Sequence, residues 1–523
     1  MKKALCSLLC LSFALSLLLA SSPVLAAEET VSRNITSACN ITLNGTGISS
    51  DLIDGKEKTY IKYDNAEIVI NAKEPIGGVY IKFDRTPPEW TLSYGETAVS
   101  CGQYGFLHEY QKVEDDNVTS LTLRFSSEVS FADIYVLSRG DKTPGFVQIW
   151  RPAEGQCDIM LLACHSDDDQ IFFAGAVPDA VSRGAEMQVC YFTNHWKTHT
   201  RPHELLNGLW TCGLDRYPVI GRFPDITRRD TEEEMLDIFV KNGYTYEEMV
   251  TDQVELLRKY KPQIVLVHDV NGEYGHGAHR LDSHTLRDAA KVSNDQTKYP
   301  ESAEKYGVWD VPKIYIHLYG ENKIEFEIDT PLERFDGKTA YQVSQDAFRC
   351  HFSQLDTYFK DWLLGTDSKP ITNSRDFKKY GPRYYGLWYS TVGEDVIKTD
   401  FYENIVLLAD QTTEEETTTA EETTEEETTT EEETTEEITE TETEETTEAE
   451  TTTEPVTTET ETDKPAETTR GAEETREATE SDGKEQTDPD YNKTELIIVI
   501  ACSACCLAVL IFILVLLIKK LKK

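Results

Sequence analysis

Two short runs of acids and histidines hold the residue types of a metal site. Residues 164–169 place one histidine and three aspartates at the end of an apolar stretch. Residues 272–279 place two histidines three positions apart among glycines. Together the runs can supply two imidazoles and one carboxylate to a metal ion, with a spare carboxylate and a spare histidine beside them. Such a set is typical of metal-assisted hydrolysis.

Apolar runs that read as strands precede both motifs and would position them. They alternate with helical patterns, the clearest over residues 246–260, and a helix start is indicated at 204–210. This alternation predicts an α/β fold with a Rossmann-like, mainly parallel sheet over residues 146–410. The expected strands are 158–163, 186–192, 264–268 and 313–316. Sites in such folds lie beyond the carboxyl ends of the strands, where both motifs fall.

The motifs also resemble a known family. The run Cys-His-Ser-Asp-Asp-Asp over 164–169 is similar to the Ala-His-Pro-Asp-Asp-Glu signature of the PIG-L (LmbE-like) de-N-acetylases. His268-Asp269, the run 272–276 and His279 resemble the second metal motif of that family. Arg201-Pro-His-Glu204 fits the Arg-x-x-Glu between the two. The resemblance covers the whole of residues 146–410 in the right order.

This resemblance implies a metal centre and a base. His165, Asp168 and His279 match the zinc ligands of the family, so the implied cofactor is Zn²⁺. Asp167 matches the general base. Because Asp167 adjoins Asp168 in the chain, one carboxylate can turn to the metal and the other to a water molecule.

Three further residues match family positions that face the substrate. His276 matches the histidine that stabilises the oxyanion and protonates the leaving amine. Tyr274 matches an active-site tyrosine that reaches the substrate carbonyl in some relatives. Arg201 matches a substrate-binding arginine.

The sequence departs from the family pattern in three places. Ser166 replaces the usual proline. Asp169, which we expect to bind substrate or brace the loop, is one methylene shorter than the usual glutamate. Ala278 stands where many relatives carry an aspartate, so a carboxylate that orients His276 must come from elsewhere, with Asp269 and Glu273 as candidates.

Four of the histidines outside these motifs could also be considered for the site. His195, His199 and His203 form a cluster that spans Pro202 and lacks a ligand set nearby. We interpret them as residues of the substrate cleft or the surface, not as a second metal site. We interpret His317, which follows a strand, as a hydrogen-bonded structural histidine.

Residues 30–145 show short alternating runs without helical periodicity, which predicts an all-β sandwich. The order of features resembles the discoidin-like, galactose-binding-type domain, whose members often bind glycans through loops. Trp90 and Tyr94 are candidate glycan contacts but more often belong to a core. Cys39 and Cys101 could form a disulfide within this domain, although seven cysteines outside the two terminal segments do not make a disulfide framework.

The two ends of the chain predict export and anchoring. Residues 1–26 read as a signal peptide cleaved near Ala26. Residues 496–518 form an apolar run of 23 residues followed by a basic tail, 519–523, which predicts one transmembrane helix with the tail in the cytoplasm. The Thr/Glu-rich segment 411–494 predicts a disordered stalk. We therefore expect a single-pass protein on a bacterial cell surface with its N-terminal part outside.

The net charge of −43 does not mark a binding face. Residues 411–490 alone hold 32 acidic and 4 basic residues, so most of the acidity belongs to the stalk. We expect no nucleic-acid partner. The oligomeric state stays open.

The sequence thus favours a zinc-dependent hydrolase that removes the acetyl group from an N-acetylglucosamine-type sugar or glycan outside the cell. One alternative is an amidase that cleaves a larger acyl group from an amino-sugar conjugate. Another is a glycan-binding surface protein whose hydrolase domain is vestigial. The identity of the sugar stays open.

Overall fold

A computed structural model describes residues 29–226, 228–377 and 379–411 of the chain. Both predicted folded domains lie almost entirely within these ranges. Among the residues so described, no helix is long and apolar enough to cross a membrane.

Several sequence predictions fall on the remaining residues. The signal peptide (1–26), the transmembrane helix (496–518) and the basic tail (519–523) lie outside the described residues, as does the stalk (411–494) after its first position. These assignments therefore stay predictions.

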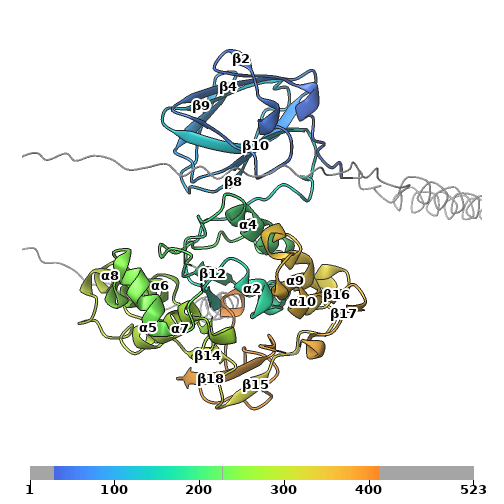
Figure 1. The fold of residues 1–523 in the computed structure, drawn as a ribbon. Helices are drawn as coiled ribbons and strands as arrows, with labels where there is room; N and C mark the ends of the chain where they lie inside the picture. The colour runs from blue at the N-terminus through green and yellow to red at the C-terminus, as the bar shows by residue number, and fades with distance from the viewer. Residues whose placement is uncertain (1–28, 227, 378, 412–523) are drawn as a thin grey trace, which may run out of the picture. The chain divides into compact units, whose positions relative to one another are not determined.

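Two antiparallel sheets form a β-sandwich at the N-terminus (Figure 1). Their strand orders are β2-β1-β4-β9-β6-β7 and β3-β10-β5-β8. Alternate residues of β4 and β6 are buried, so each strand turns one face to the core between the sheets. The bounds are β1 Asn40–Leu43, β2 Thr46–Gly47, β3 Ile61–Tyr63, β4 Ala66–Asn71, β5 Ile76–Phe83, β6 Trp90–Tyr94, β7 Thr97–Cys101, β8 His108–Lys112, β9 Ser120–Phe125 and β10 Val129–Ser138. The prediction of an all-β domain is confirmed.

Trp90 and Tyr94 belong to the core of this sandwich. They are 3% and 6% exposed, and the Trp90 indole N–H donates to Glu109 at 2.8 Å. Neither aromatic ring is therefore available to a glycan. Cys39 and Cys101 are both free thiols, so they form no disulfide.

A six-stranded sheet is the centre of the α/β domain, in the order β12-β11-β13-β14-β18-β15. The first four strands of this order pair in parallel, as predicted, whereas β18 pairs antiparallel with both β14 and β15. Strand β12 follows β11 in the chain and lies on one side of it, whereas β13 and β14 lie on the other side. The direction in which strands are added therefore reverses between β11 and β13, which makes this place a topological switch point. The bounds are β11 Ile159–Ala163, β12 Met187–Tyr191, β13 Ile264–Val267, β14 Lys313–His317, β15 Lys323–Glu325 and β18 Tyr384–Ser390.

Helices cover both faces of this sheet (Figure 1). Met160 and Leu162 of β11 pack on one face with apolar residues of α6, while Ile159 and Leu161 pack on the other face with residues of α3 and α9. The helices are α2 Asp168–Ile171, α3 Ala176–Arg183, α4 Arg201–Thr211, α5 Glu232–Lys241, α6 Tyr246–Tyr260, α7 Gly277–Ala290, α8 Pro300–Tyr306, α9 Ala340–Phe348 and α10 Tyr358–Leu363. A small hairpin joins β16 Gly365–Thr366 to β17 Lys369–Pro370. The 3₁₀ turns are η1 Thr36–Ala38, η2 Ser50–Leu52, η3 Glu273–Gly275, η4 Glu333–Phe335, η5 Phe352–Gln354 and η6 Ser374–Asp376.

Local signals set the ends of two predicted helices. Helix α6 matches the predicted range because a capping box between Thr245 and Glu248 starts it, and Lys261 in the left-handed region ends it. Helix α4 begins at Arg201, three residues before the predicted start, because Pro202 fits the first turn of a helix.

Helix α4 also contacts the sandwich, and the described residues all fall in one compact unit. His203 Nδ1 lies 2.8 Å from His108 Nε2, and Asn207 donates to Glu57 at 3.0 Å. His203 is completely buried. Its assignment to the cleft or the surface is therefore wrong, because the sandwich covers the face of α4 that carries it.

Candidate active site

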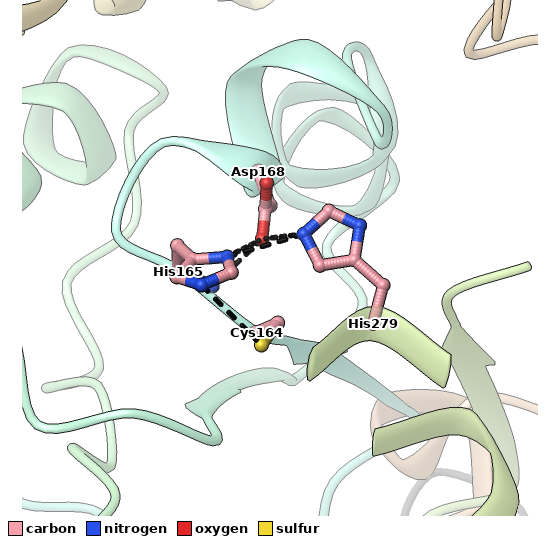
Figure 2. A group of neighbouring side chains, drawn as sticks. All are labelled: Cys164, His165, Asp168 and His279. Atoms are coloured by element: carbon pink, nitrogen blue, oxygen red, sulfur yellow. Dashed lines mark hydrogen bonds and ion pairs between the residues drawn. The ribbon is translucent and has the colours of Figure 1, made fainter. Parts of the chain in front are cut away.

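Three side chains from both motifs converge beyond the carboxyl end of β11. His165 lies two residues after the end of that strand, Asp168 begins α2, and His279 lies in the first turn of α7. The His165 Nδ1 and His279 Nε2 atoms lie 3.1 Å apart, and the Asp168 Oδ2 atom lies 3.1 Å and 3.3 Å from them (Figure 2). We call these three residues the Asp168 cluster. All are buried, and His165 is the most exposed at 7%.

The donor set of the Asp168 cluster fits a divalent metal. Two imidazole nitrogens and one carboxylate oxygen point at a common centre, as the ligands of a catalytic zinc ion do. The Cys164 thiol is also close, 3.8 Å from His165, but on the Nε2 side of that ring (Figure 2). Burial would raise the pKa of Asp168, but the charges of His279 and His165 hold that pKa well below its ordinary value. Asp168 is therefore a carboxylate that can bind a cation.

Glu273 fixes the orientation of His279 from behind. Its Oε2 atom faces the Nδ1 atoms of His268 and His279 at 2.8 Å and 2.7 Å, and its Oε1 atom faces His317 Nδ1 at 2.6 Å. Burial acts to raise the pKa of Glu273, but His268 and the three hydrogen bonds keep that pKa well below its ordinary value. Because the carboxylate accepts N–H from His279 Nδ1, the Nε2 lone pair of His279 is left for a metal.

His317 therefore has a structural position, as predicted. Its other ring nitrogen lies 3.0 Å from the carbonyl oxygen of Gly381, and the side chain is completely buried. It connects Glu273 to β14 and the segment before β18.

Asp167 lies beside the cluster and is paired with Arg201. The Arg201 guanidinium donates to Asp167 Oδ1 at 3.1 Å and to Ser166 Oγ at 2.9 Å. Burial raises the pKa of Asp167, and the positive charge of Arg201 opposes that rise. Arg201 thus contacts the candidate base directly, in addition to lying at the pocket where it was expected to bind substrate.

His276 is oriented by the backbone and not by a carboxylate. Its Nδ1 atom accepts the Ala278 N–H at 3.2 Å at the start of α7. Burial lowers the pKa of His276 well below its ordinary value, so the ring is neutral and its proton lies on Nε2. Neither Asp269 nor Glu273 orients this ring. Glu273 instead accepts a backbone N–H from Asp269, while Ala278 supplies the fixing contact.

Tyr274 occupies a strained turn, η3, just before His276. Its φ is +46°, a value that few non-glycine residues adopt. The ring packs against Phe359 and Trp362, with centroids 5.6 Å and 5.9 Å away, and Arg228 lies 5.1 Å above it. Such strain is common at functional sites.

Glycines allow the second motif to approach its neighbours closely. Gly272 has a φ of +65°, and a Cβ atom at Gly277 would lie 2.2 Å from the carbonyl oxygen of Thr231. A side chain at Gly277 would push α7, and His279 with it, away from the cluster.

A cavity of about 400 Å³ opens onto the Asp168 cluster. It can hold a ligand of one or two sugar rings. Its lining comprises His165, Asp167, Asp168, Lys197, Thr198, Arg201, Asp225, Ile226, Arg228, Tyr274, His276, Ser353, Gln354 and Phe359. Six of the eight predicted site residues thus line one cavity, and His279 completes the cluster beneath it.

Asp169 is placed differently from the other site residues. It is 1% exposed, does not line the cavity, and accepts a hydrogen bond from the side chain of Gln170. Burial raises its pKa to about 8. This position suits a brace for the loop better than a contact with substrate.

Sequence reasoning missed part of the cavity wall. Asp225 and Arg228 come from the loop before α5, and Ser353 and Phe359 come from the segment around α10. No motif marks these residues, because their place in the wall depends on how distant loops pack.

Residues 160–290 match the family model described as PIG-L: GlcNAc-PI de-N-acetylase. The match contains both motifs and assigns a PIG-L-type deacetylase domain to this segment. The resemblance predicted for these residues is confirmed.

Two curated relatives are named as deacetylases of an N-acetylated amino sugar. A Mycobacterium leprae protein named 1D-myo-inositol 2-acetamido-2-deoxy-alpha-D-glucopyranoside deacetylase is 25% identical over 193 residues, which are 32% of this chain and 61% of the relative. A Saccharopolyspora erythraea deacetylase of the same name, numbered 2, is 36% identical over 97 residues, 18% of this chain and 33% of the relative. The chain thus spans only 33% to 61% of the length of these relatives. Deacetylases of this kind are hydrolases that act on C–N bonds.

Solved structures show weaker likeness. The N,N'-diacetylchitobiose deacetylase of Pyrococcus horikoshii is 15% identical with a TM-score of 0.31, over 44% of this chain and 83% of that one. A Streptococcus pneumoniae fucose binding module is 13% identical with a TM-score of 0.17, over 21% of this chain and 96% of that one. Scores this low carry no functional argument.

Proposed function

We propose that this protein is a zinc-dependent hydrolase that removes the acetyl group from an N-acetylglucosamine-type sugar or glycan. One observation carries the proposal: two histidines and an aspartate converge at the floor of a cavity that Asp167 and His276 also line. The names of the curated relatives support an amino-sugar substrate.

Zinc fits the Asp168 cluster because its two imidazoles and one carboxylate leave a coordination position open. A zinc ion held there would lower the pKa of a water molecule to about 7 and polarise the acetamide carbonyl. Asp167 would accept the proton of that water. Burial raises its pKa and makes it a better base, while the positive charge of Arg201 opposes that rise and its guanidinium holds the carboxylate in place.

His276 acts on the other side of the scissile bond. Since Nδ1 accepts the Ala278 N–H, the Nε2 proton is the one that can be donated. As a hydrogen bond it would stabilise negative charge on the carbonyl oxygen, and the proton that Asp167 takes from the water would pass to the departing amine. Tyr274 adds a hydroxyl group to the same cavity wall.

We propose a cell-surface location for this activity. The apolar segment behind Lys2 and Lys3, the Thr/Glu-rich stalk and the 23-residue apolar run before the basic tail support it. Such a location favours a surface polysaccharide or another exposed glycan as substrate.

We also propose that the β-sandwich is of the discoidin-like type. Its two antiparallel sheets and the order of its sequence features support this assignment. Because Trp90 and Tyr94 are buried, any glycan contact would come from loops and not from these rings.

Acetate release tests the activity. Full-length protein, loaded with Zn²⁺ in detergent, is assayed on N-acetylglucosamine, N,N'-diacetylchitobiose and N-acetylglucosaminyl-inositol. We expect release from at least one substrate, and its loss in Asp167→Asn with the metal retained. The matched control is Asp336→Asn, the same change at an exposed aspartate, which should leave the rate unchanged.

Two results would decide against the proposal. A wild-type protein that binds zinc but releases no acetate from a wide glycan panel would favour a vestigial domain. Release of a longer acyl group, identified by product mass, would favour the amidase alternative.

A further inference from the structure

A second group of metal-ligand side chains lies where the β-sandwich meets helix α4. Glu57 and His108 come from the sandwich and His203 from α4, and their ligand atoms lie within 4.8 Å of one another. We call these residues the His203 cluster. They do not line the cavity above the Asp168 cluster. Both histidines are completely buried.

The two ring nitrogens face each other as those of the Asp168 cluster do. His108 Nε2 lies 2.8 Å from His203 Nδ1, compared with 3.1 Å between His165 and His279. Two nitrogens bound to one zinc ion lie slightly farther apart, at about 3.3 Å for bonds of about 2.0–2.1 Å. A shift of a few tenths of an ångström would therefore admit an ion between the rings.

A second layer of hydrogen bonds orients His108. The Trp150 indole N–H donates to Gln148 Oε1 at 3.0 Å, which identifies that atom as an acceptor. His108 Nδ1 faces the same oxygen at 2.7 Å and must donate to it. The Nε2 lone pair of His108 then points at His203, in the way that Glu273 leaves a lone pair on His279. Without a metal it accepts the Nδ1–H of His203, so His203 would bind an ion through Nδ1 once this proton moves to its Nε2 atom, which has no other partner.

Both rings are neutral, as metal binding requires. Burial lowers the pKa of His108 well below its ordinary value, and burial lowers the pKa of His203 to about 4. Neutral imidazoles are the form that binds transition metals.

Lys82 is the competitor for this site. Its ammonium donates to Glu57 Oε1, which also accepts from Asn207. Lys82 has another carboxylate within its own sheet, because it stands opposite Asp133 in the pairing of β5 with β10. The lysine can therefore pair with Asp133 when a cation takes its place at Glu57.

We propose that Glu57, His108 and His203 bind a second divalent ion of the zinc class, which connects the β-sandwich to the helix that carries Arg201. Two imidazoles and one carboxylate are ligands typical of zinc. The ion has a structural role, since no described cavity that reaches the Asp168 cluster includes these residues.

Metal analysis of the full-length protein tests the site. After loading with Zn²⁺ and removal of excess, wild type should hold about two ions per chain, and His279→Gln and Glu57→Gln about one each. One ion in wild type that is lost in His279→Gln would overturn the proposal. Acetate release is measured separately, so failure of the deacetylase proposal would leave this count unaffected.

A lysine substitution keeps the test informative if Glu57→Gln does not fold. In a His279→Gln background, Zn²⁺ titration reports on the second site alone. Lys82→Met should tighten binding there about 10-fold, because it removes a competing positive charge from Glu57. Lys112→Met, at an exposed lysine on β8, is the matched control and should not change binding. No binding in this background would show that only a hydrogen bond joins the two rings. Binding that Lys82→Met leaves unchanged would show that the ion lies elsewhere, and either result would overturn the proposal.

Discussion

The Asp168 cluster and the His203 cluster contain the same ligand types in different surroundings. The first lies under a cavity of about 400 Å³ and has a base, Asp167, and a hydrogen-bond donor, His276, beside it. The second is closed between the sandwich and α4. With three protein ligands, each cluster would leave one coordination position of a zinc ion open, but at the Asp168 cluster a cavity gives a substrate access to it. The comparison therefore teaches that ligand type alone does not indicate catalysis, whereas access and neighbouring acids and bases do.

Removing a ligand from the Asp168 cluster should give the largest effect. His279→Ala should lower acetate release about 10³-fold or more, because the metal supplies several kcal/mol of transition-state stabilisation. Initial rates and metal content are the measurements. A variant that keeps both its rate and its metal content would show that the Asp168 cluster does not hold a catalytic metal, and the two clusters would then no longer differ in function.

Removing the hydrogen-bond donor His276 should have the next largest effect. His276→Gln should lower acetate release about 10²–10⁴-fold while the metal content stays at the wild-type value. His276 lines the cavity but is not one of the converging ligands. Loss of metal in this variant would instead place His276 among the ligands.

The sequence predicted the Asp168 cluster because its signals are local. Apolar runs identified the strands, and parallel strands bring their carboxyl ends to one edge, so the residues after β11 and β13 had to meet. The antiparallel strand β18 was missed, since an aromatic run over residues 384–390 does not show by itself which strand it pairs with.

The His203 cluster could not be predicted in the same way. His108 and His203 are 95 residues apart and belong to different domains. The helical pattern of α4 does not reveal that the sandwich covers its His203 face. The role of Glu273 was missed for a similar reason, because its three histidine partners come from two strand ends and a helix.

The residues behind the ligands should have a moderate effect on metal affinity. Glu273→Gln should weaken zinc binding at the Asp168 cluster about 10–100-fold, because the orienting carboxylate is lost. Excess zinc should restore much of the acetate release. Competition with a chelator measures the affinity, and Glu333→Gln, at an exposed glutamate, is the control. Unchanged affinity would mean that packing alone holds His279 in place.

The smallest effect concerns stability against acid in the metal-free protein. Burial lowers the pKa of His203 to about 4 from an ordinary 6.5. As the pH falls below about 6.5, the unfolded chain takes up a proton that the folded chain does not, so this histidine costs about 1.4 kcal/mol of stability per pH unit down to about 4. Above about pH 6.5 this histidine is neutral in both the folded and the unfolded chain, so it costs no stability there.

Urea unfolding at several pH values with a chelator present measures this slope. His203→Gln should make the decline in unfolding free energy between pH 6.5 and 4 shallower by about one proton. His351 gives a matched comparison outside the His203 cluster, since burial lowers its pKa to about 3. His351→Gln should flatten the same decline in wild-type and His203→Gln backgrounds alike, because the two histidines do not share a contact.

The same measurement with zinc in place of the chelator tests the comparison itself. If zinc protects wild type but not His203→Gln from acid, the His203 cluster binds metal in the folded protein. If zinc protects both proteins equally, the His203 cluster does not bind metal, and the two clusters differ in metal binding although their ligand types are the same.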